Sequence, residues 1–505
     1  MTITRRDIVK GAATAAIMAG TGMGKMARAS TRGGSDYRNH DALGLADLVR
    51  TKQVSPLELL EEAITRTETQ DKRLNFLAQE MFDYGREKIA KGLPDGLFTG
   101  VPFLEKDLHM HMAGHPSGQG SRLYTGYVPD FTSELVKRHE AAGLVIFGKT
   151  TTPEFGVTAT TESIAEGPTR NPWNLDHSSG GSSGGAASAV ASGVIPAAHA
   201  TDGGGSIRIP ASACGLFGMK PSRGRTPMGP LRTEGWGGAS VNHAVTRSVR
   251  DSAALLDVTH GMETGSRYSA PEPDGTFLSQ LSKAPRPLRI ALMLEPISGA
   301  PVDAACIKAA RDAARLCESL GHHVEEKSFK ADSAAIGAAS FALISTALAN
   351  DIDARAAMAG VAINTDVIEP ITLGFYHVGK QTSGVAVAKA NNTLQEAAIV
   401  VSRFMDNFDV ILSPTLAAPP ALLGVFDLDK TDFQAWGMAT GAYTPFAGIF
   451  NSTGQPSMSV PLGMSDEGLP IGTMFTGRYG DEATLFQLAG QLETAQPWFA
   501  RVAKV

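Results

Sequence analysis

Hydrophobic residues recur along this chain with two kinds of pattern, one typical of amphipathic helices and one typical of buried strands. The clearest helix begins after Ser55, where Pro56 takes the first position, Glu58 completes a capping box and apolar residues follow at helical spacing. The same criteria predict helices over residues 43–51, 84–91, 133–142, 186–192, 249–260, 303–320 and 481–492. Short apolar runs predict strands or extended segments over residues 75–81, 97–104, 144–147, 217–220, 288–294, 324–326, 410–413, 457–461 and 472–476.

The order of these segments indicates the fold class. Strand and helix patterns alternate, which predicts an α/β fold with helices on both faces of a central mixed sheet. The alanine-rich residues 331–408 are predicted to be mostly helical, with interruptions at Pro370 and Gly374, and to form a wall or cap because they carry few reactive groups. We find no internal repeat and no proline-rich linker in the sequence, so we expect one domain over residues 41–505.

The N-terminal segment has the three parts of an export signal in order. Arg5-Arg6 lies in a stretch that resembles the twin-arginine motif, a weakly apolar run covers residues 11–24, and Ala27-Arg28-Ala29 matches a cleavage site. We expect a cleaved signal peptide over residues 1–29, a linker over residues 30–40 and a periplasmic protein. The apolar run is too short to remain in a membrane as a helix. An ordinary amphipathic or frayed N-terminus is the alternative.

Composition and charge narrow the classes of partner. Of the 505 residues, 43% are hydrophobic and 19% are charged, and the formal net charge is -6. The mean hydropathy of -0.05 is that of a soluble globular protein with a large core. Because the chain carries no excess of positive charge, we expect no nucleic-acid partner. We expect a small-molecule substrate, and the composition leaves a homodimer open.

The cysteines do not form a redox or metal-binding motif. Cys214, Cys306 and Cys317 are scattered along the chain, with no second cysteine at ligand spacing. We expect buried free thiols. A disulfide, with Cys306 or Cys317 as a partner, stays an alternative if the compartment is oxidising.

Two further patterns suggest ligand sites but lack what those sites require. The pairs His109/His111 and His322/His323 have no third ligand at suitable spacing, so we expect solvated or packing histidines and no metal. Residues 143–150 have the spacing of a phosphate-binding loop, but the residues between the glycines are large and apolar. We expect a strand end there.

The stretch richest in candidate chemistry covers residues 178–210. Two glycine-rich turns, at 180–185 and 203–205, place serines where the backbone can bend tightly and approach a bound group. Ser206 follows three N–H groups that no side chain obstructs, as an oxyanion pocket requires. However, a serine is a weak nucleophile without a base, and no histidine stands in a suitable position. These residues alone leave open a nucleophilic serine and a structural or ligand-binding glycine loop.

The same residues resemble a known family. GGSSGG at 180–185 and TDGGGSIRIPA at 201–211 satisfy every constrained position of the amidase signature. Matches outside these motifs include Gly100-Val101-Pro102 with Lys106-Asp107, Gly148-Lys149-Thr150 with residues 152–155, Asn171-Pro172-Trp173-Asn174, residues 215–221 with Gly224-Arg225, and residues 451–472. The chain is similar to the amidase signature family over most of residues 41–500, and closest in look to the bacterial amidases that include 6-aminohexanoate cyclic dimer hydrolase.

The resemblance implies a Ser-cisSer-Lys triad and no metal or organic cofactor. Matched by position, the nucleophile is Ser206, the bridging serine with a cis peptide bond is Ser182, and the base is Lys106. The supporting groups implied in the same way are Ser183 beside the lysine, Gly203, Gly204 and Gly205 as the oxyanion hole, and Thr201 and Asp202 as orienting residues.

Lys106 must be neutral when it acts as a base. Burial away from carboxylates would lower its pKa from the ordinary value of about 10.4. The chain departs from the family pattern at Glu105, where an apolar residue is usual, and at Gly203, where a larger one is common. Because side chains alternate along an extended segment, we expect Glu105 and Asp107 to point away from the lysine. We expect Gly203 to widen the pocket.

The activity that follows is hydrolysis of a carboxylic amide through a covalent acyl-enzyme. An amidase subunit of a glutamine-dependent tRNA amidotransferase is disfavoured by the export signal, and a catalytically silent periplasmic binding protein by retention of the triad. The predicted pocket walls are residues 331–380 and 415–450, including Phe426, Trp436 and Phe446. Their apolar character favours an amide with an apolar part, and ordinary core packing is the alternative.

Overall fold

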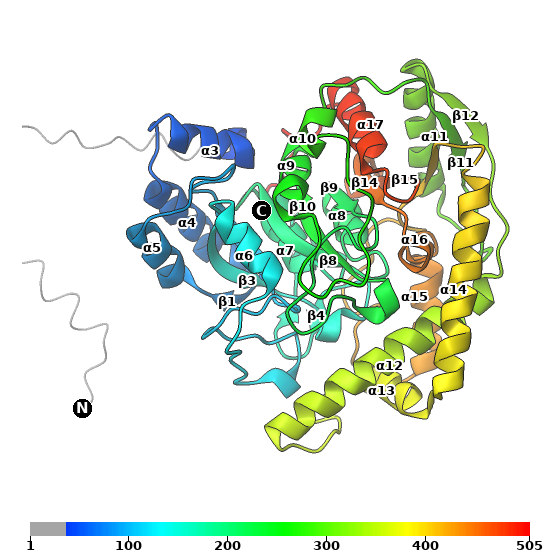
Figure 1. The fold of residues 1–505 in the computed structure, drawn as a ribbon, viewed down its shortest axis with the longest axis horizontal. Coiled ribbons are helices and arrows are strands. Elements are labelled where there is room, and N and C mark those ends of the chain that lie inside the picture. Colours follow the sequence, from blue (N-terminus) through cyan, green and yellow to red (C-terminus); the bar gives the residue numbers. More distant parts are fainter. Residues whose placement is uncertain (1–36) are drawn as a thin grey trace, which may run out of the picture. The chain divides into compact units, whose positions relative to one another are not determined.

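A mixed sheet of eight strands is the main structural layer of the protein (Figure 1). It is seen in a computed structural model, which describes residues 37–505. In spatial order the strands are β12 (His323–Glu326), β11 (Arg289–Leu292), β13 (Val410–Pro414), β15 (Pro470–Gly477), β14 (Ser457–Met464), β9 (Phe217–Lys220), β10 (Val241–Thr246) and β8 (Ala197–Asp202). β11 is parallel to β12 and β13, and the other neighbouring pairs are antiparallel.

A smaller sheet carries the chain to the edge of the large one. Its spatial order is β1 (Leu77–Glu80), β3 (Val145–Thr150) and β2 (Pro102–Lys106), with β2 parallel and β1 antiparallel to β3. β2 lies beside β8, and every residue of these two strands is buried. Two short ribbons pair β4 (Glu162–Ser163) with β5 (Gly167–Pro168) and β6 (Arg170–Asn171) with β7 (Asn174–Ser178).

Helices cover both faces of the large sheet, as predicted. Along β13, Val410 and Leu412 belong to a hydrophobic cluster with α11 (Ala304–Ser319) and α17 (Glu482–Ala495). Ile411, between them, belongs to a second cluster with α14 (Gly384–Phe404) and α16 (Gly448–Thr453). Successive side chains of a strand point to opposite faces, so both faces of β13 are buried under helices. The α/β class with a mixed sheet is therefore confirmed.

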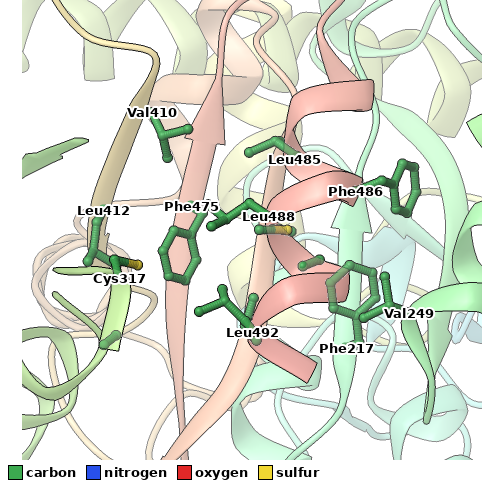
Figure 2. Packing of buried hydrophobic residues seen from close by; sticks show 14 of the residues in the cluster. Phe217, Val249, Cys317, Val410, Leu412, Phe475, Leu485, Phe486, Leu488 and Leu492 are labelled. Atoms are coloured by element: carbon green, nitrogen blue, oxygen red, sulfur yellow. The ribbon is translucent and has the colours of Figure 1, made fainter. Parts of the chain in front are cut away.

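The first of these clusters is shown in Figure 2. Leu485, Leu488 and Leu492 of α17 occur at helical spacing and face Phe475 of β15. Each is fully buried. Burying a side chain of this size stabilises the folded state by about 1.5–3 kcal/mol. The cluster fixes α17, the closing helix that the sequence predicted, on the sheet.

The other helices of the described chain are mostly those that the sequence predicted. They are α3 (Ala42–Arg50), α4 (Pro56–Leu74), α5 (Phe82–Lys91), α6 (Glu134–Ala141), α7 (Gly184–Ala191), α8 (Arg208–Cys214), α9 (Val249–Thr259), α10 (Phe277–Gln280), α12 (Ser333–Ala359), α13 (Pro370–Gln381) and α15 (Phe433–Tyr443). Short 3-10 turns are η1 (Tyr37–Asn39), η2 (Arg122–Tyr124), η3 (Glu154–Gly156) and η4 (Trp236–Gly238).

Helices α12, α13 and α14 form the predicted helical region, and Figure 1 shows them together on one side of the sheet. Pro370 begins α13, whereas Gly374, predicted as an interruption, lies inside it. By length and composition alone, α12 is the one helix of the described residues that could cross a membrane. In the structure it packs against α13 and α14 and buries Ile336 and Leu343 in the core.

The local structure agrees with some of the sequence predictions and differs from others. The capping box is confirmed, since the Ser55 hydroxyl accepts the Glu58 N–H at 3.2 Å and the Glu58 carboxylate accepts the Ser55 N–H at 2.8 Å. The extended segment over 97–104 is wrong in its first half, where a turn precedes β2. Strand β10 was not predicted, because Asn242 and His243 interrupt its apolar pattern.

The remaining sequence predictions concern the rejected loop, the thiols and the N-terminus. Residues 143–150 lead into and include β3, which ends at Thr150, as expected for a strand end. Cys214, Cys306 and Cys317 are free and buried. The predicted signal peptide and most of the predicted linker lie outside the described residues.

Candidate active site

Lys106 ends β2 and is fully buried among hydroxyl groups. Its Nζ lies 2.6 Å from Ser182 Oγ, 2.8 Å from Thr201 Oγ1 and 3.1 Å from Ser183 Oγ. The three hydroxyls come from the turn before α7 and from β8, which are distant from β2 in the sequence but packed beside it. The structure therefore brings the predicted lysine and bridging serine into direct contact.

The surroundings of Lys106 favour the neutral amine. Burial lowers the pKa of Lys106 well below its usual range, and the negative charge of Asp202 acts in the opposite direction with a smaller effect. A neutral amine has two hydrogens and one lone pair. At least one of the three hydroxyls must then donate to Nζ, and Ser182 is the nearest.

Ser182 and Ser183 are held by the glycine-rich turn. The peptide bond between Gly181 and Ser182 is cis, as the resemblance implied. Ser183 Oγ accepts the backbone N–H of Thr201 at 3.2 Å, which links this turn to β8. The first glycine-rich turn is thus joined to the strand that leads into the second one.

Ser206 stands between the second glycine-rich turn and α8. It is 8% exposed and lines a small cavity of about 20 Å³, here called the nucleophile cavity, together with Ser182, Thr201 and Gly203. Within the described residues no hydrogen bond joins Ser206 to Ser182. The two hydroxyls share the cavity, and their direct contact is not formed in this structure.

Asp202 braces the loop that carries Ser206. Its carboxylate oxygens accept Arg208 Nε and Nη2 at 2.9 Å each, and one of them accepts Asn451 Nδ2 at 2.8 Å. Burial favours the protonated acid, but the charge and hydrogen bonds of Arg208 outweigh it and lower the pKa of Asp202 to about 2. These contacts are compatible with the orienting role that the resemblance implied for Asp202, which stays a prediction.

The backbone N–H groups of the loop are not equivalent. The Gly205 N–H donates to Asp202 Oδ1 at 2.7 Å, so this group is already engaged. Among residues 37–505 the N–H groups of Gly203, Gly204 and Ser206 have no hydrogen-bond partner. The Gly205 N–H therefore holds the loop in place, and the oxyanion role implied for Gly203, Gly204 and Gly205 stays a prediction.

Gly203 does not widen the pocket, contrary to the prediction. A Cβ atom at this position would lie 2.6 Å from Trp236 Cε3 and 2.7 Å from Cζ3. The indole ring of Trp236 thus occupies the space that a larger residue would fill. The ring also lines the nucleophile cavity.

The carboxylates beside the lysine in the sequence contact other groups. Glu105 Oε1 lies 2.7 Å from His139 Nδ1, and Asp107 accepts the Gly118 N–H at 2.7 Å. Burial alone would raise the pKa of Glu105, but the charge and hydrogen bond of His139 outweigh it and the net shift is downward. Among residues 37–505, the Lys106 amine has only hydroxyl groups as hydrogen-bond partners, so neither carboxylate contacts it, in agreement with strand alternation.

Two larger cavities adjoin the nucleophile cavity. One, the apolar cavity of about 290 Å³, shares Gly203 and Trp236 with it. The other, the aromatic cavity of about 160 Å³, shares His109, Arg232 and Asp351 with it. The predicted wall segments do contribute, since α12 and the residues after α15 line the apolar cavity.

The three aromatic residues predicted as pocket walls pack elsewhere. Phe426 stacks on Tyr443 with ring centroids 4.9 Å apart, and Trp436 joins an aromatic cluster with Phe375. Phe446 is fully buried under the sheet. None of them lines the described cavities beside Ser206, so ordinary core packing is the correct interpretation.

The paired histidines also lie away from a metal-binding geometry. Burial lowers the pKa of His109 and His111 to about 3, so both are neutral packing groups rather than solvated ones. His322 Nδ1 accepts the Leu288 N–H at 3.1 Å, and His323 is exposed on β12. Over residues 37–505 no group of three or more His, Cys, Asp or Glu side chains is placed to hold a metal ion.

Sequence reasoning missed several residues around the site. Arg208 and Asn451 brace Asp202, and Trp236, Arg232 and Asp351 line cavities next to Ser206. Arg208 lies within the signature motif, and its charge six residues after Asp202 was an available signal. Asn451 begins the segment 451–472 that matches the family, but nothing in that match indicated its contact with Asp202. Trp236, Arg232 and Asp351 come from loops and a helix to which no local pattern points.

Comparisons with known proteins agree with the resemblance. A sequence model of the Amidase family matches residues 58–486. The 6-aminohexanoate-cyclic-dimer hydrolase of Paenarthrobacter ureafaciens is 37% identical over 477 residues, which cover 91% of this chain and 96% of that protein. A solved structure of 6-aminohexanoate cyclic dimer hydrolase has a TM-score of 0.87 at 36% identity, covering 92% of this chain and 99% of that one. A bacterial aryl acylamidase structure has a TM-score of 0.81 at 28% identity, covering 92% and 99%. The chain therefore belongs to the amidase signature family, hydrolases that act on the carbon–nitrogen bonds of amides.

Proposed function

We propose that the protein hydrolyses a carboxylic amide by a Ser206–Ser182–Lys106 triad and a covalent acyl-enzyme. The observation that carries the proposal is the 2.6 Å contact between Lys106 Nζ and Ser182 Oγ at a lysine whose pKa burial lowers. A neutral amine in that position can accept the serine proton. Ser182, in turn, shares the nucleophile cavity with Ser206.

In the first half of the reaction, Lys106 takes the hydroxyl proton of Ser182, and Ser182 takes the hydroxyl proton of Ser206. Ser206 Oγ attacks the amide carbonyl carbon and forms a tetrahedral oxyanion. The proton then returns through Ser182 to the nitrogen of the leaving group, the C–N bond breaks, and ammonia or an amine departs. The product on the protein is an ester of Ser206.

In the second half, water replaces the amine. Its proton passes by the same relay to Lys106, its oxygen attacks the ester carbonyl, and the returned proton restores the Ser206 hydroxyl as the carboxylate leaves. The free N–H groups of Gly203, Gly204 and Ser206 are the donors that we assign to the oxyanion in both halves. Donors of this kind contribute about 2.7–4 kcal/mol each when they are fixed in advance.

The substrate class is proposed from the relatives and the site together. The relatives named above act, by their names, on a cyclic amide dimer and on aryl acylamides, so small non-peptide amides are the class to test. Linear amides, cyclic amides, anilides and carbamates form a suitable panel, with released amine as the readout.

The triad is tested by three substitutions and one matched control. Ser206→Ala, Ser182→Ala and Lys106→Ala should each lower kcat by at least about a thousandfold, with the circular dichroism spectrum unchanged. Ser188→Ala removes a buried serine of α7 whose hydroxyl donates to the Arg170 carbonyl, and it should keep the activity. A fluorophosphonate should label Ser206, as shown by mass spectrometry. Full activity of Ser206→Ala would refute the proposal.

We also propose export by the twin-arginine route, with the mature protein in the periplasm and no nucleic-acid partner. The support is the Arg5-Arg6 segment with its apolar run and cleavage motif, and the net charge of -6. Replacing both arginines with lysine should leave the protein uncleaved in the cytoplasmic fraction. Sedimentation of the purified protein will distinguish a monomer from a homodimer.

A further inference from the structure

The nucleophile cavity is too small to hold a substrate by itself. Its volume is about 20 Å³, whereas a single water requires roughly 10–15 Å³ by the same measure. The substituents of an amide bound at Ser206 must therefore extend into the neighbouring space. The apolar cavity, at about 290 Å³, is the larger of the two that adjoin it.

The apolar cavity has a lining of one chemical kind. Ile336, Leu343 and Ile344 of α12 contribute to it, with Ile449 of α16 on another side. Its polar lining groups are serine and threonine side chains, and none of its described lining residues is charged. A charged end group placed there would lose its hydration without gaining a partner. The cavity therefore suits an uncharged hydrocarbon group.

Trp236 stands between the two cavities. The ring lines both of them and lies against Gly203, where a single added carbon would be 2.6 Å from it. Among residues 37–505 its indole N–H has no hydrogen-bond partner, so packing alone holds the ring. Its backbone adopts a φ of 52°, a conformation that a bulky residue rarely takes and that is concentrated at ligand sites.

We propose that the apolar cavity binds a hydrocarbon substituent of the scissile amide and that Trp236, seated on Gly203, determines how long that substituent can be. This inference rests on the proposed amide hydrolysis at Ser206 and adds the class of group beside it. The hydrocarbon is either the acyl chain or the alkyl group of the leaving amine. Both present the same chemistry to the cavity, and the substrates below distinguish them.

The expected size of the effect follows from burial of methylene groups. Each methylene that enters the cavity should raise kcat/KM about fourfold, which corresponds to about 0.8 kcal/mol. Two substrate series measure it: straight-chain acyl anilides of increasing acyl length, and N-alkyl acetamides of increasing alkyl length. The series that responds identifies the group that the cavity binds.

Two glycines of α15 provide a matched pair of variants. Gly441 and Gly437 are both exposed, and an added side chain at either position would meet open space, but only Gly441 lines the apolar cavity. Gly441→Leu should lower kcat/KM about tenfold or more for the longest substrates and leave acetamide, which has no group long enough to enter the cavity, unchanged. Gly437→Leu should behave as the unmodified protein. Gly337→Leu on α12, which also lines the cavity in open space, repeats the test at a second position.

The role of Trp236 is tested by a rescue. Gly203→Ala should lose activity toward every substrate because its methyl group displaces the ring, and Gly203→Ala/Trp236→Ala should recover it while accepting longer chains. A double variant no better than Gly203→Ala would overturn this role.

The cavity assignment and the proposed amide hydrolysis can be refuted independently. Equal kcat/KM across both series, or an equal effect of Gly441→Leu on short and long substrates, would overturn the cavity assignment while acetamide hydrolysis by Ser206 still stood. As a readout without turnover, medium-chain primary amides, if the cavity binds the acyl chain, or N-alkyl acetamides, if it binds the alkyl group of the amine, should raise the Tm of Ser206→Ala, and Gly441→Leu should abolish that rise. No rise at saturating amide would also overturn the assignment.

Discussion

The buried ion pair between Asp202 and Arg208 has two effects that replacing Asp202 with asparagine can measure. The pair stabilises the fold beneath Ser206, and the Asp202 charge influences the pKa of Lys106. Neither Asp202 nor Arg208 is exposed, and two hydrogen bonds of 2.9 Å join them. Because the pKa of Asp202 is lowered to about 2, its stabilising contribution is fully present at neutral pH. That contribution is lost only as the pH falls from the ordinary value of about 3.9 through the folded value.

The expected loss of stability follows from the charge that remains. Asparagine keeps the shape of the side chain, but it leaves the Arg208 guanidinium buried without a counter-charge, which destabilises proteins by about 3–5 kcal/mol. Asp202→Asn/Arg208→Met removes both charges and should destabilise less than Asp202→Asn alone. Denaturant unfolding at pH 7, followed by circular dichroism, measures all three proteins. A double variant that is less stable than Asp202→Asn would refute the reasoning.

The same substitution should also change the pH profile in a known direction. The negative charge of Asp202 raises the pKa of Lys106, opposing the larger effect of burial. Removing that charge makes the neutral lysine easier to form. The acid limb of the kcat/KM profile of Asp202→Asn should therefore move to lower pH, although kcat itself falls because Gly205 loses a charged acceptor. A limb that moves to higher pH would contradict the assignment of Lys106 as the base.

Two further predictions concern single hydroxyl and carboxyl groups. Thr201→Val removes the 2.8 Å partner of Lys106 and should lower kcat about tenfold or more, as measured by amine release over time; an unchanged kcat would remove Thr201 from the site. Burial and the neighbouring Glu154 charge raise the pKa of Glu369. The folded state therefore keeps a proton that the unfolded chain releases near its ordinary pKa of about 4.3, and stability falls as the pH rises above that value. Glu369→Gln should flatten the decline in Tm between pH 5 and pH 9, and an unchanged slope would contradict it.

Elements set by local chemistry could be predicted from the sequence. The helix α4 begins where Ser55 and Glu58 cap each other, since both groups of the capping box lie within one turn. The signature residues could be predicted for the same reason, because each glycine-rich turn is a continuous stretch of sequence. Strand β10 shows the limit. It is buried between β8 and β9, but Asn242 and His243 are polar and find their side-chain partners outside the sheet, in Pro227 and Ser252, so its sequence lacks a strand pattern.

The site could be predicted only as far as it repeats the family motif. Lys106 meets Ser182 because β2 packs against α7, whose preceding turn carries Ser182, a contact that no spacing in the sequence reveals. At Gly203 the sequence led to the wrong prediction. The absence of a side chain suggested open space, but the structure places the Trp236 ring against this glycine. A glycine in a sequence does not show whether the space beside it is empty or is filled by another side chain.

Gly374 and Gly337 allow a filled and an open glycine position to be compared by measuring protein stability. The sequence suggested a break there, because glycine is about 1 kcal/mol worse than alanine inside a helix. In α13, however, an added Cβ would lie 2.6 Å from Phe433 Cδ2, and such overpacking costs about 1–3 kcal/mol. Gly337, inside α12, meets open space instead. Gly337→Ala should therefore raise the denaturation midpoint, whereas Gly374→Ala should lower it despite the better helix former. Equal shifts of the same sign would mean that helix propensity, and not the contact with Phe433, governs this position.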